Sequence, residues 1–513
     1  MGNIVIIGGG VTGLSAGIHL LLREGNQDKV TICEAHGVAG GNLTGWDRGG
    51  CHIDNCVHWL TGTLPGTDLY RMWQRLGVPV DGQTVKLPSL FTVREGGKSL
   101  TLWRDMERTW REMLALSFED HAEINRLFHA VRLLTQYGHL GLDSVRLSEA
   151  VRYSPVLMRY WLMSTGTLSD KFRHPLIRRF VTGVCGRVFS AVCLVEVIST
   201  FCSGNGDLPA GGSTAMADAM VRRFRSLGGE LLTGAEVRRV QLGTHTKSGK
   251  NTAESAVLSD GRILPVDQVI FTGDPSMFCG RVIGAPMPQR LSAVYRDYQS
   301  IRFSGIHAAF EIPVDALTFS GDLILPLDEQ ARVLFGADQV ILREFSHEPG
   351  FAPEGSTVLI ATVFCPENTA VRVIRAWQDK ASYRDMKRQF AGTLREIAAR
   401  ELKLSADHLR TLDVWTPATY RRFVRSEIGS FMSFVMKPGY IPHKLPNRLP
   451  GVDNVILAGQ WLRSPGGLPL AAEEGVRACE TVTHMQVKSF KTREKQERRP
   501  AAGYSHAVSS RDM

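Results

Sequence analysis

Two cysteines, two histidines and an aspartate stand close together in GGCHIDNCVHW, residues 49–59. Cys51, His52, Cys56 and His58 are all of residue types that bind zinc. In an extended stretch, however, His52 and His58 would lie about 20 Å apart, at about 3.3 Å per residue. Zinc holds its ligands at about 2 Å. The cluster is therefore not expected to converge on one ion, and no metal site is predicted.

A glycine-rich turn near the N-terminus predicts a dinucleotide site. IVIIGGGVTGLSAG reads as a strand, residues 4–7, followed by Gly8-x-Gly10-x-x-Gly13 and a helix. In such a turn Gly8 permits the tight bend and Gly10 lets the backbone approach a pyrophosphate. Gly13 allows the helix to pack closely on the strand, so that its N-terminal N–H groups face the phosphates.

An acidic residue after the second strand strengthens this prediction. KVTICEA ends in Glu34, 21 residues past Gly13, where a carboxylate accepts hydrogen bonds from a ribose hydroxyl. The same carboxylate would repel a 2′-phosphate, which disfavours NADP. FAD and NAD both fit these residues, and a glycine-rich turn in an unrelated α/β fold is the alternative.

Further motifs carry a resemblance to a known family. They are the Gly40-Gly41 pair, the block PAGGSTAMADAMVRRFRSLGGELLTGAEVRRV, the block LSDGRILPVDQVIFTGDP and the closing LAGQW and PGGLP. Together with the first turn they resemble, over nearly the whole chain, the FAD-dependent phytoene desaturase, carotenoid isomerase and retinol saturase group of the amine-oxidase-like flavoproteins. The resemblance implies FAD as cofactor. It also implies an α/β fold in which a Rossmann-type FAD-binding domain is interleaved with a mixed-sheet substrate domain and a helical cap.

The motifs and the resemblance together define a set of expected cofactor contacts. Val237 falls where the family's backbone meets adenine, and Gly459 with the Leu468–Pro469 stretch would flank the lower phosphate and the isoalloxazine ring. The chain departs from the family at Asn42, where Arg is common, and at Gln460, where many relatives carry Asp or Glu. The complete expected set is Gly8, Gly10, Val11, Thr12, Gly13, Glu34, Ala35, Gly41, Asn42, Val237, Gly459, Gln460, Leu468 and Pro469.

The closing motif also predicts an electrostatic contribution. NVILAGQWLRSPGGLPLAAEEG reads as a strand at 455–458, a Gly/Pro loop at 464–469 and a helix from about Leu470. If the N-terminus of that helix faces the flavin pyrimidine, its positive dipole end stabilises reduced flavin and favours hydride acceptance.

The elements that position these motifs follow from composition and period. A chain of 513 residues with 43% hydrophobic and 22% charged content is typical of a soluble globular protein with two or three domains. Helical spacing dominates 105–205, whereas 276–425 mixes strands with a helix near 384–400. The predicted order is FAD-binding domain (1–104), helical cap (105–205), FAD-binding domain (206–275), substrate domain (276–425), FAD-binding domain (426–487) and a basic flexible tail (488–513).

Several candidate residues belong to the substrate end. SPVLMRYWLMS, residues 154–164, is either a buried cap helix near the substrate cavity or a lipid-contacting patch. The resemblance places the end of the opening cluster on a turn under the flavin. His58 is the catalytic candidate there, with packing alone as the alternative, and Trp59, Tyr420 and Trp461 are candidate substrate-lining residues.

The leading functional hypothesis is an FAD-dependent oxidoreductase that desaturates, saturates or isomerises a long apolar molecule by hydride transfer at flavin N5. A flavin amine or amino-acid oxidase is the close alternative, and a non-catalytic lipid or prenyl carrier is the alternative of another class. No second dinucleotide motif is present, so electrons must pass to or from a partner that meets the flavin transiently.

Composition sets the remaining expectations. Nine cysteines, an odd number without regular pairs, indicate free thiols and a cytoplasmic location. A formal net charge of +9 with an apolar substrate favours a peripheral membrane surface as partner. The basic tail carries seven Lys and Arg against three Asp and Glu and is interpreted as solvated, and no nucleic-acid partner is expected. No signal peptide or membrane-spanning segment is predicted.

Overall fold

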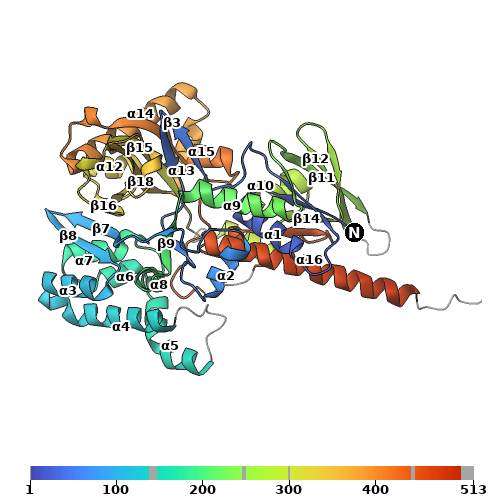
Figure 1. The fold of residues 1–513 in the computed structure, drawn as a ribbon, viewed down its shortest axis with the longest axis horizontal. Helices are drawn as coiled ribbons and strands as arrows, with labels where there is room; N and C mark the ends of the chain where they lie inside the picture. The colour runs from blue at the N-terminus through green and yellow to red at the C-terminus, as the bar shows by residue number, and fades with distance from the viewer. Residues whose placement is uncertain (1, 138–146, 245–249, 298–300, 441–444, 498–513) are drawn as a thin grey trace, which may run out of the picture.

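The computed structural model describes residues 2–137, 147–244, 250–297, 301–440 and 445–497. Its two largest sheets are a parallel sheet of five strands and a mixed sheet of seven. In Figure 1 the seven-stranded sheet and the helices of the predicted cap lie at one side of the molecule, and the last helix of the chain projects to the other.

Strands from distant parts of the chain form the parallel sheet. In sheet order they are β10 (Glu230–Leu232), β2 (Lys29–Cys33), β1 (Asn3–Ile7), β14 (Gln268–Phe271) and β20 (Val455–Leu457). All neighbouring strands pair in parallel. β1 and β2 are buried along most of their length, as is typical of strands covered on both faces. The strands predicted at 4–7, before Glu34 and at 455–458 are therefore present, and the domain that they form is interrupted as predicted.

Helices α1 (Val11–Leu21), α9 (Gly212–Ser226) and α16 (Leu468–Glu497) belong to this domain, and α1 contacts both of the others. At two positions in these helices the backbone of another segment comes so close that only glycine fits. A Cβ on Gly13 would lie 2.0 Å from the carbonyl oxygen of Gly8, and a Cβ on Gly475 of α16 would lie 2.6 Å from that of Thr12. The tight turn and the close packing of α1 on α16 thus both exclude a side chain.

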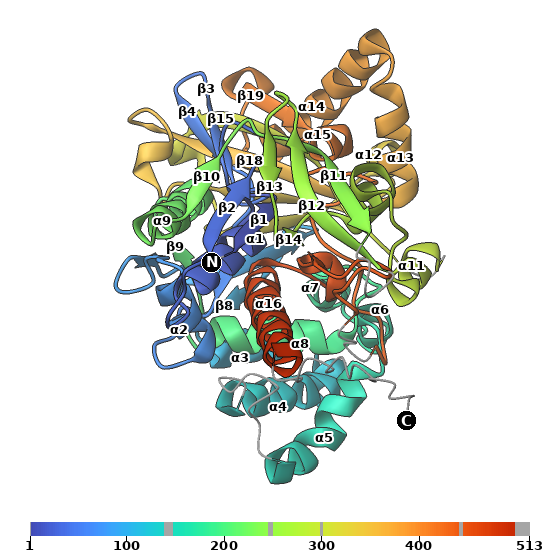
Figure 2. The same cartoon turned by 90° about the vertical axis from the view of Figure 1, so that its right-hand side faces the viewer.

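A three-stranded antiparallel sheet connects β10 to β14. It consists of β11 (Val237–Thr244), β12 (Asn251–Leu258) and β13 (Ile263–Pro265). In Figure 2 it lies above α16, with the cap helices below. The N–H of Ala235 donates to the carbonyl of Glu34 at 2.8 Å, which holds the start of β11 beside the end of β2.

The mixed sheet has the order β19 (Arg410–Trp415), β15 (Phe303–Pro313), β18 (Ser356–Pro366), β17 (Gln339–Glu344), β16 (Asp322–Pro326), β7 (Ser89–Glu95) and β8 (Lys98–Trp103). The predicted boundary at residue 104 needs correction, because β7 and β8 belong to this sheet and not to the parallel one. β7 pairs in parallel with β16. The apolar side chains Phe91, Val93, Leu100 and Leu102 share a core with the cap helices.

The cap is helical, as its period predicts. Its helices are α3 (Met106–Leu116), α4 (His121–Tyr137), α5 (Leu147–Trp161), α6 (Thr165–Ser169), α7 (Pro175–Gly183) and α8 (Ala191–Cys202). In the substrate domain, the helix predicted near 384–400 is α14 (Lys380–Leu402), which packs on β15 and β19.

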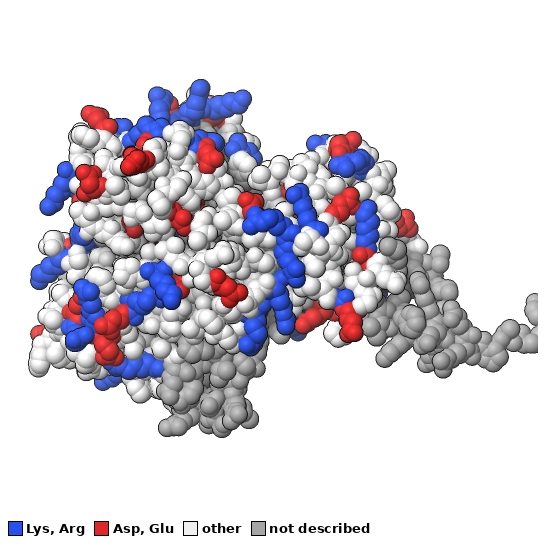
Figure 3. Space-filling model, in the orientation of Figure 1, with Lys and Arg blue, Asp and Glu red and all other residues white. Residues whose placement is uncertain are grey.

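The C-terminal segment differs in part from its prediction. α16 continues to Glu497, so the first ten residues of the predicted flexible tail are helical, while 498–513 lie outside the described residues. In the described part of the chain, no helix has the length and apolar character needed to cross a bilayer. The face shown in Figure 3 carries a stripe of Lys and Arg near its middle, and both signs of charge are mixed elsewhere on it.

Candidate functional site

One large cavity joins the parallel sheet to the cap and the mixed sheet. It has a volume of about 2220 Å³ and is lined from Ile7 and Gly8 at the parallel sheet to Leu157 and Trp161 in the cap. Sites for single drug-sized ligands are typically about 300–1,000 Å³. The cavity is therefore large enough for a dinucleotide and a second molecule together.

Most of the predicted cofactor residues meet at one end of this cavity. Those that line it are Gly8, Gly10, Val11, Thr12, Glu34, Ala35, Gly41, Asn42, Val237, Gln460, Leu468 and Pro469. Gly13 and Gly459 do not line it. Gly13 packs against the carbonyl of Gly8, and a Cβ on Gly459, whose φ is +112°, would lie 2.9 Å from the carbonyl oxygen of Thr272. These two glycines shape the backbone around the site.

The carboxylate of Glu34 is held in place by the chain on both sides of it. One oxygen accepts a hydrogen bond from the N–H of Gly9 at 2.7 Å, and the other accepts one from the N–H of His36 at 2.9 Å. Because a carboxylate oxygen accepts more than one hydrogen bond, these bonds orient the group and leave it able to bind a ribose hydroxyl. That role stays a prediction.

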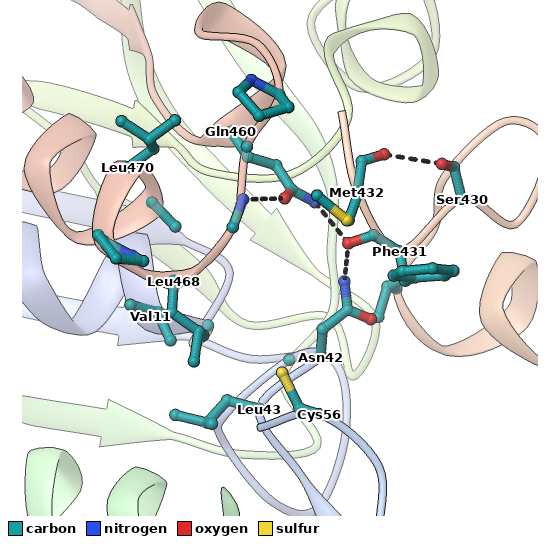
Figure 4. A pocket seen from close by; sticks show the side chains of 18 of the residues that line it. Val11, Asn42, Leu43, Cys56, Ser430, Phe431, Met432, Gln460, Leu468 and Leu470 are labelled. Carbon is teal, nitrogen blue, oxygen red and sulfur yellow. Dashed lines mark hydrogen bonds between the residues drawn. The ribbon is translucent and has the colours of Figure 1, made fainter. Parts of the chain in front are cut away.

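The two departures from the family pattern converge on one loop. The side-chain amides of Asn42 and Gln460 both donate to the carbonyl of Phe431, at 3.2 and 3.0 Å, and the oxygen of Gln460 accepts from the N–H of Gly467 at 3.4 Å. Figure 4 shows these three bonds beside the start of α16. The two amides therefore connect three distant segments of the chain around the cavity: the N-terminal segment at Asn42, the loop at Phe431 and the closing segment at Gln460.

The cavity wall around Asn42 and the start of α16 fits a polar cofactor. The buried side-chain oxygen of Asn42 has no hydrogen-bond partner among the described residues, although a buried amide oxygen normally has one. It lies in the cavity wall, where an N–H or O–H of a flavin cofactor can satisfy it. α16 begins at Leu468, two residues before the predicted start, and Pro469 lies in its first turn, where a missing N–H costs nothing.

The other predicted site residues, His58, Trp59, Tyr420 and Trp461, line the same cavity. Nδ1 of His58 contacts the guanidinium of Arg343 and lies 3.3 Å from a carboxylate oxygen of Asp322, to which it donates in the tautomer that carries its proton on Nδ1. Arg343 also donates two hydrogen bonds to Asp322, at 2.7 and 2.8 Å. Burial and the charge of Arg343 lower the pKa of His58, which keeps the ring neutral at pH 7.

A second polar group surrounds Tyr420. Its hydroxyl donates to the side-chain oxygen of Asn55 at 2.9 Å, accepts from Trp415 at 3.2 Å and lies 3.1 Å from Nε2 of His307. Burial lowers the pKa of His307 to about 3, so this ring is also neutral. Tyr420 is thus a fixed part of the cavity wall, with its hydroxyl already occupied.

Sequence reasoning missed four of these residues: Asn55, His307, Asp322 and Arg343. Asn55 lies within the opening cluster, where it was given no role, and the other three stand in no recognisable motif. For His307, Asp322 and Arg343 the available signal was alternation along β15, β16 and β17, which assigns a residue to a face of the sheet without naming its neighbours.

The opening cluster is split among different contacts. β4 (Cys51–Asp54) pairs with β3 (Gly45–Arg48) and ends at Asp54. His52 bonds to Asp47 at 2.7 Å, whereas Asp54 accepts from the hydroxyl of Ser213 at 2.6 Å. Within the described ranges, no three His, Cys, Asp or Glu side chains are placed to hold a metal ion.

The apolar segment 154–164 contributes to both the cavity and the surface. Leu157, Met158 and Trp161 line the cavity. Tyr160 is buried, whereas Met158 is 43% exposed and Leu162 58% exposed. The expected location beside the cavity agrees with these contacts, and lipid contact stays a prediction.

Comparisons with known proteins agree with this geometry. The family model described as flavin containing amine oxidoreductase matches residues 11–483. A phytoene dehydrogenase of Streptomyces griseus is 23% identical over 94% of this chain and 95% of its own length. A hydroxyneurosporene desaturase of Cereibacter sphaeroides is 26% identical over 55% of this chain and 58% of its own.

A solved structure supports the same architecture. Wild-type putrescine oxidase bound to putrescine matches with a TM-score of 0.55 and 15% identity, over 94% of this chain and 99% of that one. At this identity the likeness concerns the fold alone. Together with the family match, it confirms the predicted fold class.

Proposed function

The chain belongs to the family of flavin-containing amine oxidoreductases, and from that premise we propose that it transfers hydrogen between a long apolar, carotenoid- or isoprenoid-like molecule and FAD. The predictions of FAD as cofactor and of an FAD-dependent oxidoreductase are confirmed by the family match. Two relatives are named as a phytoene dehydrogenase and a hydroxyneurosporene desaturase. These names favour desaturation as the direction of the reaction.

The observation that carries the proposal is the continuity of the cavity. It runs from the cofactor residues past His58 and Trp59 into the cap, where Leu133, Leu134 and Leu157 belong to its lining. Burial of apolar surface contributes about 25 cal/mol per Å². A long apolar molecule therefore gains most from such a lining. Peripheral membrane association and a transient electron partner stay predictions.

Desaturation removes a hydride and a proton from neighbouring carbon atoms and leaves a double bond. Bound FAD supplies the hydride acceptor. The N-terminus of α16, in the cavity wall at Leu468, supplies a positive dipole end that stabilises negative charge. In the proposed mechanism the neutral His58 ring carries its proton on Nδ1, which donates to Asp322, so Nε2 is unprotonated and takes the proton. Among the described residues Nε2 has no hydrogen-bond partner, because the bonds of this ring are made through Nδ1.

The first test distinguishes the substrate classes. Purified protein loaded with oxidised FAD is mixed anaerobically with an acyclic C40 polyene, and separately with putrescine. We expect the polyene to bleach the visible flavin band and putrescine to leave it unchanged. Bleaching by putrescine alone would establish the amine-oxidase alternative. Purified protein that binds no flavin would contradict both enzymatic functions and favour the carrier.

His58→Gln is expected to slow flavin reduction by the polyene about 10²-fold, because general-base catalysis contributes about 10²–10⁴-fold. The lowered pKa of His58 keeps the base neutral around pH 7. The wild-type rate should therefore be level there and fall on acidification, and the variant should lose this dependence. Stopped-flow absorbance measures both effects.

His52→Gln is the matched control, since His52 does not line the cavity. Its rate and pH profile should equal those of the wild type. If His58→Gln reduces flavin at the wild-type rate, His58 only packs against its neighbours.

A further inference from the structure

One face of helix α8 forms part of the cavity wall in the cap. Val192, Cys193, Glu196, Val197 and Thr200 of this helix line the cavity. Residues three and four apart on a helix lie on the same face. Glu196 therefore has Val192 and Cys193 on one side of it and Thr200 on the other.

The surroundings of Glu196 are predominantly apolar. α8 packs against α4 and α5, which contribute Leu133, Leu134, Leu157 and Trp161 to the same cavity. The Glu196 side chain lines this cavity and is exposed within it.

The carboxyl group of Glu196 has no partner in the described part of the chain. No hydrogen bond or ion pair to it is formed there, and burial alone raises its pKa. The other acids discussed above differ, because Glu34 accepts two backbone N–H groups and Asp322 is paired with Arg343. When an apolar molecule fills the cavity and displaces water from this carboxyl, an isolated charge there becomes strongly unfavourable. A bound group that satisfies this carboxyl would remove that penalty.

Glu196 lies apart from the cofactor residues. None of the expected FAD contacts belongs to α8. The chain just after the C-terminal end of α8 lies near Trp59, since a Cβ on Gly206 would be 3.6 Å from the Trp59 ring. Glu196 precedes the end of the helix by six residues, about 9 Å along its axis at about 1.5 Å per residue. Its partner is therefore a part of the substrate away from the Trp59 end of the cavity.

We infer that Glu196 determines substrate specificity by hydrogen-bonding a hydroxyl group on an otherwise apolar molecule, a conclusion that rests on the proposed function. A hydroxyl both donates and accepts, so it pairs with a carboxylate and with a protonated carboxyl. A pure hydrocarbon leaves the carboxyl unsatisfied. Sites built to bond a substrate hydroxyl discriminate strongly against analogues that lack it.

The test compares two matched probes on the FAD-loaded enzyme. The probes are an acyclic C40 polyene hydrocarbon and the same hydrocarbon with one terminal hydroxyl, titrated in detergent micelles. We expect the wild type to bind the hydroxylated probe about tenfold more tightly, a factor that corresponds to one hydrogen bond to a buried group. Glu196→Leu should abolish this preference, mainly by weakening the hydroxylated probe, and Glu196→Gln should retain part of it.

Thr200→Val is the matched control, because it removes a hydroxyl one helical turn away on the same face. It should keep the wild-type preference, and all three variants should keep the flavin content and spectrum of the wild type. Equal affinities in the wild type, or an unchanged preference in Glu196→Leu, would overturn the inference. So would stronger binding of a polyene with a terminal amine, lost in Glu196→Leu, which would assign an ammonium to the site.

Flavin reduction separates this inference from the proposed function. A hydroxyl preference that depends on Glu196, without flavin reduction by either probe, would support the binding role and contradict the reaction. Flavin reduction by both probes with equal affinity would support the reaction and contradict the role of Glu196.

Discussion

Gly13→Ala is expected to yield protein without bound flavin. A Cβ at this position would lie 2.0 Å from the carbonyl oxygen of Gly8, well inside van der Waals contact, and the obstructing atom belongs to the backbone. In an ordinary helix the same substitution is favourable by about 1 kcal/mol. Here α1 must move away from β1, which displaces the turn that is predicted to hold the pyrophosphate.

The visible flavin absorbance per protein in the purified variant measures the effect, together with thermal unfolding with and without added FAD. A bound cofactor raises stability in proportion to the logarithm of its concentration over Kd, so FAD should stabilise the wild type and not the variant. Gly37→Ala is the control, because no atom lies within 4 Å of the new Cβ there. A fully loaded Gly13→Ala protein would refute the predicted role of this turn.

Arg343→Met is expected to destabilise the protein by about 3–5 kcal/mol, which is the usual cost of leaving one partner of a buried ion pair alone. The side chains of Arg343 and Asp322 are each 13% exposed. Burial by itself raises the pKa of Asp322, but the charge of Arg343 and the hydrogen bonds from His58 and Arg343 bring it well below its ordinary value of 3.8. Without Arg343 this carboxylate is buried and uncompensated.

The dependence on pH follows from this lowered pKa. A carboxyl whose pKa is lower in the folded protein contributes stability above its ordinary value, and that contribution is lost as the pH falls below it. The difference between wild type and Arg343→Met should therefore be largest near neutral pH and shrink in acid. Urea denaturation at several pH values measures it.

The double variant Asp322→Leu/Arg343→Met provides the matched control. It should recover much of the lost stability, because an apolar pair can replace a buried ion pair at little cost. Equal stability of the single variant and the wild type at pH 7 would contradict the proposed importance of this pair.

Short-range patterns determined the nucleotide end of this protein. The strand at residues 3–7, the turn from Gly8 to Gly13, the following helix and Glu34 all lie within 34 residues. Their conformations depend on the steric needs of neighbouring residues, which the sequence displays directly. The closing strand and the helix from Leu468 were predictable for the same reason, and family motifs in order then identified the cofactor.

Tertiary structure alone decided that β7 and β8 belong to the seven-stranded sheet, and it alone decided the partners of the polar side chains. His58 meets residues 264 and 285 positions away in the chain, and Asn42 meets a carbonyl 389 positions away. Alternation along a strand says only which side chains share a face. It cannot say which strand lies beside it, nor that Glu196 on a cap helix has no partner among the described residues that surround the cavity. Such contacts depend on how whole sheets and helices pack, because the energies that select them are shared among many residues distant in sequence.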